Sequence, residues 1–424
     1  MSSNDAATAA GEGRLDLALF GATGFTGALT AEYLARRAAA GESLGPGQEG
    51  PLRWAIAGRN RDKLEALRRR LEEEVPGSPL PEILVASVDD ADSLRALTGA
   101  CRVLLTTVGP YARFGEGVVA ACVETGTHYA DITGEPDFVS TLRDRYDAAA
   151  REKGLRLVSC CGFDSIPHDL GALLAVRQLP ADQKIDLRGF VRAKGGMSGG
   201  TWRSAVNAMA ETPIFGKKSG KKKRARERSP APSEGERRVR RGSQKVYREK
   251  LFGEWVMPLP TIDPQVVRRS ARELPDYGPD FRYGHFLRIG SLPRMAVVSG
   301  TIGSVFALSK LPPARKWLLS LKDSGDGPTE EQRARSRFSV TFLGRAGDGS
   351  RTVVEVRGGD PGYDETSKML AETGLSLAFD GDRLPQQAGT LTPAVALGGC
   401  LLERLREAGL VFEVVETKGP GEDA

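Results

Sequence analysis

Three glycines in one short loop are the residues whose type and spacing most directly indicate chemistry. Gly21, Gly24 and Gly27 form a GxxGxxG pattern between an apolar run, Leu15–Phe20, and a helical pattern, Phe25–Ala40. The first glycine of such a loop permits a sharp turn, the second lets the backbone approach a pyrophosphate, and the third lets the helix pack closely on the strand. The helix N-terminus then faces the negative phosphates. We therefore expect a dinucleotide site here, with a purely structural glycine turn as the alternative. The other contacts expected from this loop are Thr23, Phe25 and Thr26.

The end of the second apolar run indicates which dinucleotide is bound. It reads Gly58-Arg59-Asn60, at the place where NAD-specific sites usually have an acid that holds the ribose 2′-hydroxyl. A guanidinium there suits the 2′-phosphate of NADP(H), by charge and by bidentate geometry. We therefore expect NADP(H), with NAD(H) as the less favoured cofactor and a capping role for Arg59 as the structural alternative. Asp89, after the third apolar run, is either an adenine-side contact or the N-cap of the next helix.

Two further segments carry polar side chains directly after predicted strands. Val108, Gly109 and Pro110 are expected to lie against the nicotinamide ribose, because open α/β sheets bind ligands at the carboxyl ends of their strands. Tyr111 is the first candidate for a catalytic proton donor, and His168, after a later strand, is the second. For each of them a structural hydrogen bond is an equal alternative. No tyrosine has a lysine four residues later, which disfavours the Tyr-x-x-x-Lys chemistry of short-chain reductases.

Strands and helices alternate through the first part of the chain, and this alternation predicts the fold class. Short apolar runs separated by helical patterns indicate βαβ units. We expect an α/β fold with a Rossmann-type doubly wound parallel sheet over residues 14–165, after a disordered tail at 1–13 that lacks the features of a signal peptide. Residues 166–390 are expected to form a second, α+β domain. Residues 391–424 are expected to form a helix and a strand that can pack back on the first domain.

Composition and charge exclude several classes of protein. Five cysteines at irregular spacing and three histidines disfavour a disulfide scaffold and a zinc site, so we expect no metal and a cytoplasmic location. The net charge of +5 comes from the tract 217–250, which holds 15 Lys and Arg against 4 Asp and Glu. We expect this tract to be a disordered, solvated loop, with attraction to an anionic membrane as the alternative. Its only aromatic residue is Tyr247, which disfavours nucleic-acid binding.

One apolar stretch, Met295–Leu308, is uncharged but shorter than a membrane-spanning helix requires. We favour a buried core element of the second domain. An interfacial patch and the lining of an acyl-chain site are the alternatives.

Several motifs together resemble the saccharopine dehydrogenase-like oxidoreductases. They are GATGFTG, AGR, TTVGPYARFGEGVVAACVETGTHYADITGE, CGFDSIPHDLG and GTLTPAVALGGCLLERLREAGLVFEVV, and the similarity covers residues 14–210 and 335–416. Within that family the chain is most similar to the actinobacterial branch called trans-acting enoyl reductases. The resemblance implies a Rossmann domain that binds NADP(H), an inserted α+β domain and a C-terminal segment that returns to the first domain.

The resemblance also implies a function. Enoyl reductases of this branch reduce a carbon–carbon double bond of an acyl chain, so the expected function is NADP(H)-dependent reduction of an enoyl intermediate in lipid or polyketide-derived lipid biosynthesis. The expected partners are an acyl substrate, which a carrier can deliver, and the periphery of an anionic membrane through 217–250. Two alternatives stay open. One is a non-catalytic lipid-associated protein that keeps the dinucleotide fold as a scaffold, and the other is a saccharopine-type imine reductase that acts on an amino acid.

Overall fold

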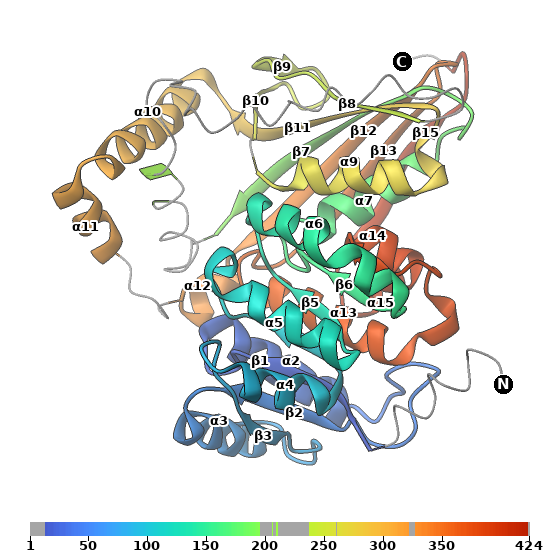
Figure 1. The fold of residues 1–424 in the computed structure, drawn as a ribbon. Helices are drawn as coiled ribbons and strands as arrows, with labels where there is room; N and C mark the ends of the chain where they lie inside the picture. The colour runs from blue at the N-terminus through green and yellow to red at the C-terminus, as the bar shows by residue number, and fades with distance from the viewer. Residues whose placement is uncertain are drawn as a thin grey trace. The chain divides into compact units, whose positions relative to one another are not determined.

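The structure is a computed structural model that describes residues 13–195, 206, 209–210, 237–259, 261–321 and 327–422. The chain divides into two compact units (Figure 1). The first unit holds the chain up to Gly171, together with Thr261–Ser270 and Val356–Phe412. The second unit holds Ala172–Pro260, Ala271–Glu355 and the residues from Glu413 onward.

A seven-stranded parallel sheet forms the centre of the first unit, which confirms the expected α/β fold class. Its strand order is β14-β6-β5-β4-β1-β2-β3. The central strands are apolar and almost fully buried, as parallel strands covered by helices require. The order reverses between β1 and β4, so the carboxyl ends of these two strands mark the point where dinucleotides bind. The strands are β1 (Leu15–Phe20), β2 (Trp54–Gly58), β3 (Glu82–Val85), β4 (Cys101–Thr106), β5 (His128–Asp131), β6 (Arg156–Val158) and β14 (Gly389–Leu391).

Helices connect the strands of this sheet and pack on it. α4, α5 and α6 contact one another in chain order, whereas α2 packs against α13, which also contacts β1, β4 and β5. Nearly every residue of α13 is buried, because the sheet, α2 and α15 surround it. The helices are α2 (Phe25–Ala39), α3 (Arg61–Glu74), α4 (Ala91–Gly99), α5 (Tyr111–Thr125), α6 (Pro136–Glu152), α7 (Ile166–Val176), α13 (Asp364–Phe379), α14 (Pro393–Ala396) and α15 (Gly398–Glu407).

The second unit is built on an eight-stranded mixed sheet, which confirms the expected second α+β domain. Its strand order is β15-β13-β12-β7-β11-β10-β9, and β8 pairs with β11. β7 lies between two long neighbours, β11 in parallel and β12 antiparallel. β12 and β13 are hydrogen-bonded neighbours joined by a short turn, as the Gly-rich sequence between them predicts. The strands are β7 (Ile185–Lys194), β8 (Arg238–Arg241), β9 (Tyr247–Glu249), β10 (Glu254–Pro258), β11 (Asp280–Gly290), β12 (Arg337–Ala346), β13 (Arg351–Gly358) and β15 (Val411–Lys418).

The second unit also contains the apolar helix α10 (Leu292–Ser309), which we expected from the sequence to be buried. The prediction of a buried position for Met295–Leu308 is wrong, because only 6% of α10 is buried. Within the described part of the chain, α10 is the one helix that is long and apolar enough, by length and composition, to cross a membrane. The helices that remain are α11 (Pro312–Ser320) and α12 (Glu330–Ala334) of the second unit, and α9 (Asp263–Glu273), most of which belongs to the first unit.

The chain returns to the first unit earlier than we expected. The return begins at Val356, not near residue 391, and it brings α13 as well as α14 and α15. The last strand, β15, lies in the second sheet beside β13. The expected C-terminal segment is therefore shared between the two units.

Part of the basic tract is folded. In its described part, 237–250, β8 and β9 pair with β11 and β10, so the prediction of a disordered loop is wrong there. Arg240 pairs with the carboxylate of Asp280, whereas Arg237 and Arg248 donate to backbone carbonyls. Residues 217–236 of the tract, and 1–12 of the expected N-terminal tail, lie outside the described residues.

Candidate active site

The glycine loop adopts a shape that side chains would block. Gly21 follows β1 with φ +88°, and a Cβ there would lie 2.8 Å from side-chain atoms of Thr107 and Val108. A Cβ on Gly27 would lie 2.2 Å from the carbonyl oxygen of Gly21, so this glycine allows α2 to start directly against the loop. The loop therefore brings the start of α2 close to the carboxyl ends of β1 and β4.

Helix α2 begins without a side-chain cap. Gly24 is its N-cap residue, and its first turn contains no acidic residue. Thr23 and Gly24 are exposed at the tip of the loop. The first turn of a helix has backbone N–H groups that lack intrahelical partners, and together with the helix dipole they attract anions. The expected contacts at Thr23, Phe25 and Thr26 thus lie where a pyrophosphate would be held.

Arg59 stands at the end of β2, as expected, and its side chain is exposed. It forms no ion pair with any residue that the structure describes. Its neighbour Asn60 is the N-cap of α3, where Oδ1 accepts a hydrogen bond from the Lys63 N–H at 2.9 Å. Gly58, the last residue of β2, is buried. An unpaired guanidinium beside the glycine loop fits the 2′-phosphate of NADP(H).

Two neighbouring acids, Asp89 and Asp90, follow β3, and only one of them caps the next helix. Asp90, not Asp89, is the N-cap of α4, and its Oδ1 accepts from the N–H groups of Asp92 and Ser93. The N-cap alternative for Asp89 is therefore wrong. Its side chain is exposed, and an adenine-side contact stays a prediction for it.

The loop after β4 is fixed by a carboxylate that the sequence analysis did not single out. Val108 and Gly109 lead into a cis Gly109–Pro110 peptide bond, after which α5 begins. Glu135, from the loop after β5, accepts hydrogen bonds from the N–H groups of Tyr111 and Ala112 at 2.9 and 2.8 Å. The positive end of α5 is thus occupied by this side chain, whereas that of α2 is not.

Tyr111 makes the structural hydrogen bonds that were left open as the alternative to proton donation. Its ring is buried and packs on Phe138 with the centroids 5.7 Å apart. Its hydroxyl donates to the Thr106 carbonyl at 3.0 Å and accepts from the Ile132 N–H at 3.4 Å. Burial raises the pKa of Tyr111 well above its usual value. These contacts link the ends of β4 and β5, and they argue against Tyr111 as a proton donor to a ligand.

A buried carboxyl group connects the ends of β5 and β6. Asp131 accepts hydrogen bonds from the N–H groups of Thr133 and Cys160 and from the Ser159 hydroxyl. Burial raises the pKa of Asp131 to about 6, although the hydrogen bonds act in the opposite direction. Because its partners follow both β5 and β6, Asp131 positions the two strand exits.

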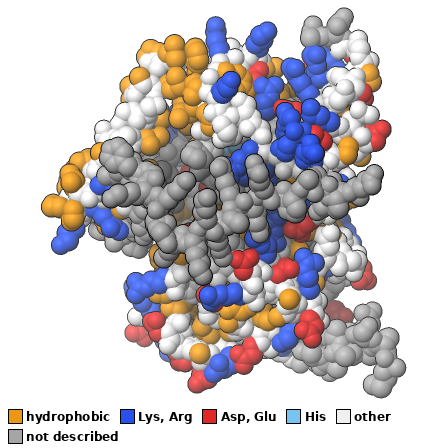
Figure 2. All heavy atoms as spheres, turned by 45° about the horizontal axis from the view of Figure 1, so that its top comes forward, with side chains coloured by type: hydrophobic (Ala, Val, Ile, Leu, Met, Phe, Trp, Pro, Cys, Tyr) orange, Lys and Arg blue, Asp and Glu red, His pale blue; other side chains and the backbone are white. Residues whose placement is uncertain are grey.

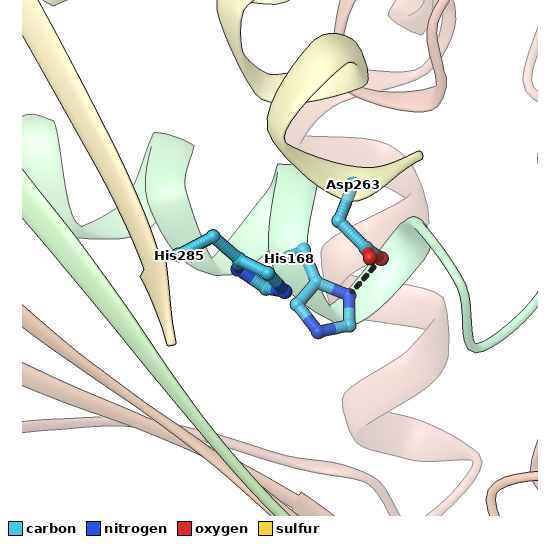
Figure 3. Close-up of side chains that lie close together, drawn as sticks. All are labelled: His168, Asp263 and His285. Atoms are coloured by element: carbon cyan, nitrogen blue, oxygen red, sulfur yellow. Dashed lines mark ion pairs between the residues drawn. The ribbon is translucent and has the colours of Figure 1, made fainter. Parts of the chain in front are cut away.

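His168 lies at the start of α7 and faces a carboxylate (Figure 3). Its Nδ1 is 2.9 Å from Oδ1 of Asp263, and both side chains are almost completely buried. The edge of its ring also packs on Phe163. The third residue labelled in the figure, His285, belongs to the second unit, where its Nδ1 lies 3.1 Å from the Tyr283 hydroxyl.

Asp164, in the motif CGFDSIPHDLG, is a candidate catalytic acid to which we assigned no role from the sequence. It lies in the loop between β6 and α7, its side chain is exposed, and a Cβ on Gly134 would be 3.3 Å from its Oδ2. Desolvation by the surrounding protein, and then the negative charge of Asp263, raise the pKa of Asp164 to about 6, while His168 lowers it. Asp164 is thus a solvent-accessible residue whose carboxyl group is largely surrounded by protein atoms, and a pKa of about 6 at the carboxyl ends of the strands suits proton transfer near neutral pH.

Comparison with known proteins shows the family. Residues 17–158 match the family described as saccharopine dehydrogenase NADP binding domain. A Mycobacterium tuberculosis protein with the provisional name trans-acting enoyl reductase is 37% identical over 94% of this chain and 97% of its own length. A trans-acting enoyl reductase of Mycobacterium leprae is 33% identical with the same coverage. A saccharopine dehydrogenase-like oxidoreductase of Bos taurus is 30% identical over 95% of this chain and 97% of its own. The chain belongs to the saccharopine dehydrogenase-like oxidoreductases.

Membership of the saccharopine dehydrogenase-like oxidoreductases makes the chain an NADP(H)-binding enzyme. The matched domain contains the glycine loop, Arg59 and the segment Val108–Pro110, so the cofactor residues expected from sequence all lie inside it. A solved apo structure of the L-glutamate-forming saccharopine dehydrogenase of Saccharomyces cerevisiae has a TM-score of 0.51 and 13% identity, and it covers 94% of this chain and 99% of its own. At that identity the likeness establishes the fold alone.

Proposed function

We propose that the protein uses NADPH to reduce the carbon–carbon double bond of an α,β-unsaturated acyl thioester, as a step in building a lipid. The observation that carries this proposal is the relationship, over nearly the whole chain, to proteins named trans-acting enoyl reductases. Bound NADPH would supply the hydride, which adds to the carbon β to the thioester carbonyl. The chain itself must bind the cofactor, stabilise negative charge on the thioester oxygen and deliver a proton to the α-carbon.

The residues of the first unit fit the binding of the cofactor. The uncapped start of α2 offers backbone N–H groups to the pyrophosphate, and the loop glycines leave room for it. Arg59 offers a guanidinium to the 2′-phosphate. Val108–Pro110, at the end of β4, would lie against the nicotinamide half, because this is the strand across the switch point from β1.

Asp164 is our candidate for the proton donor. A donor needs both access to the substrate and a pKa near the working pH, so that a useful fraction is protonated before transfer and the anion is stable afterwards. Asp164 is exposed and has a pKa of about 6, whereas the Tyr111 hydroxyl is buried and occupied by backbone groups. Asp263 and His168 adjust the pKa of Asp164 in opposite directions, so we assign them a positioning role.

The test is NADPH oxidation in the presence of 2-enoyl-coenzyme A thioesters of increasing chain length. We expect turnover with the wild type, and a fall in kcat of about 100-fold or more for Asp164→Asn, because removal of a general acid typically costs that much. The dissociation constant for NADPH should be unchanged in this variant. Asp382→Asn, at an exposed acid of the same unit, is the matched control and should keep full activity.

The rival explanations give different results in the same assay. A non-catalytic scaffold would bind NADPH but would not oxidise it, whichever substrate is added. An imine reductase would oxidise NADPH only with an amino acid and an aldehyde together. Gly27→Ala places a Cβ against the Gly21 carbonyl and should abolish NADPH binding, whereas Gly117→Ala, on an open face of α5, should not. Equal NADPH binding by these two variants would contradict the assignment of the glycine loop.

A further inference from the structure

Two helices of the second unit expose apolar side chains without a partner for them among the described residues. They are α10 and α11, with the residues that begin and end them, and we call residues 291–321 the α10–α11 arm. Figure 1 shows these helices standing away from the sheet, and Figure 2 shows hydrophobic side chains gathered where they lie. The large exposed apolar residues are Leu292, Val297, Ile302, Leu311, Trp317 and Leu321. Exposed apolar surface of this extent marks a binding surface.

The positions at which the arm joins the sheet determine the side from which it can enter a membrane. β11 leads into α10, and β12 follows the arm; both pair with β7, β11 in parallel and β12 antiparallel. The end of β11 and the start of β12 therefore lie at the same edge of one sheet. α10 is about 27 Å long, close to the thickness of a bilayer core, but α11 is about 14 Å long and too short to return across it. Both attachments at the same end of one sheet, together with the shortness of α11, favour entry of the arm into a membrane from one side.

Two exposed hydroxyl groups of α10 bond to carbonyls of their own helix. The hydroxyl of Thr301 donates to the Val297 carbonyl at 2.9 Å, and that of Ser304 donates to the Gly300 carbonyl at 2.8 Å. Such bonds remove the penalty for placing a hydroxyl group among lipid chains, where no water replaces it.

The charges of the arm all have one sign. Residues 291–321 contain four basic residues and no Asp or Glu, although the chain as a whole has nearly equal numbers of both kinds. Arg294, near the start of α10, and Lys316, on α11 beside Trp317, are exposed. Basic residues next to apolar ones, with an exposed tryptophan, are typical of helices that lie in the interface of an anionic membrane.

We propose that the α10–α11 arm is a monotopic anchor, which inserts into one leaflet of a bilayer that contains anionic phospholipid. This goes beyond the proposed function and does not depend on it. The anchor lies in the second unit and uses none of the cofactor residues, so catalysis and membrane binding can fail separately. It would bring the enzyme to the surface where lipid intermediates are found.

The test is co-sedimentation of the full-length protein with vesicles of phosphatidylcholine, with and without phosphatidylglycerol. We expect binding to the anionic vesicles, and at least about a ten-fold lower partition for the double variant Val297→Glu/Ile302→Glu, because two inserted apolar groups become charged. Both positions are exposed, at 68% and 46%, so the variant should fold and keep its affinity for NADPH. Val415→Glu changes an exposed valine of β15, at 54%, and is the matched control with unchanged binding.

Tryptophan fluorescence and light scattering distinguish insertion of the arm into a membrane from its burial against a second copy of the chain. The fluorescence of Trp317 should shift to the blue on binding, and the shift should be lost in Trp317→Phe. Failure of the wild type to bind anionic vesicles, or equal binding by the double variant, overturns the proposal. A wild type that is dimeric in light scattering, with a monomeric double variant and no vesicle binding, also overturns it, because a second copy of the chain then covers the arm.

Discussion

At the scale of single residues, the choice of cofactor depends on the guanidinium of Arg59. Arg59→Ala should raise the dissociation constant for NADPH by about 10- to 100-fold and leave that for NADH nearly unchanged, because only NADPH carries the 2′-phosphate that the guanidinium can pair with. Fluorescence titration of both cofactors measures this. Arg61→Ala is the control, because Arg61 is exposed and lies 3.9 Å from Glu65 on the same helix. If both cofactors weaken equally on loss of Arg59, then Arg59 only shapes the loop.

Single residues were predictable from sequence where a local pattern identifies them, and not where their contacts come from distant segments. The places of the glycine loop and of Arg59 in the fold were predictable, because the pattern that identifies them lies within a few residues of a strand and a helix. Tyr111 was misjudged, because the groups that occupy its hydroxyl, the Thr106 carbonyl and the Ile132 N–H, depend on the packing of β4 beside β5. Asp164 acquires its raised pKa from desolvation by the folded protein and then from the charge of Asp263, and neither can be read from the residues next to it in sequence.

At the scale of elements, a buried charge cluster joins α13 and α15 to the start of the chain. Arg404 of α15 pairs with Asp380 at 2.7 Å and with Glu372 at 3.3 Å, and both acids are 1% exposed. Glu372 also accepts hydrogen bonds from the Tyr33 hydroxyl and from Arg37, which are on α2. The cluster therefore fixes α2, which carries the cofactor loop, against α13.

Loss of Arg404 should be far more damaging than loss of an exposed arginine. Arg404→Met leaves two buried carboxylates with one fewer cation and should lower the free energy of unfolding by about 3–5 kcal/mol. Arg61→Met is the control: Arg61 is exposed and lies 3.9 Å from the exposed Glu65, outside the cluster, so the change should be below about 1 kcal/mol. Urea denaturation of both variants measures the difference. Combining Arg404→Met with Asp380→Asn should recover part of the loss, and no recovery would show that packing, not charge, is the cause.

At the scale of the whole molecule, the two sheets differ in how well the sequence predicted them. The parallel sheet was predictable because each of its strands is a short apolar run between helical patterns, and only β14, three residues long, was missed. The second sheet depends on pairings between distant segments. β10 and β11 were missed, because arginine and histidine side chains interrupt the apolar pattern of β11. The return of α13 to the first unit was missed for the same reason, since a helix pattern does not show which sheet it covers.

A half-buried histidine and a buried carboxyl group affect the stability of the molecule in mild acid in opposite directions. Burial, and then the nearby Arg156, lower the pKa of His128 to about 4, and its Nδ1 accepts a hydrogen bond from the Arg156 N–H. Between pH 6.5 and 4 the unfolded chain therefore binds a proton that the folded chain refuses, so His128 makes stability fall as the pH falls. The pKa of Asp131 is raised to about 6, so in nearly the same range the folded chain holds a proton that the unfolded chain releases, and stability rises as the pH falls.

Removal of one of these two groups should expose the effect of the other. His128→Asn keeps an acceptor for the Arg156 N–H but cannot be protonated, so the variant should gain up to about 2 kcal/mol relative to the wild type between pH 7 and pH 5. Urea denaturation of both proteins at the two pH values measures this gain. The absolute stability of the variant at pH 7 serves as the control for packing, since both side chains are neutral there. If the difference between the two proteins is the same at both pH values, a group other than His128 sets the acid sensitivity.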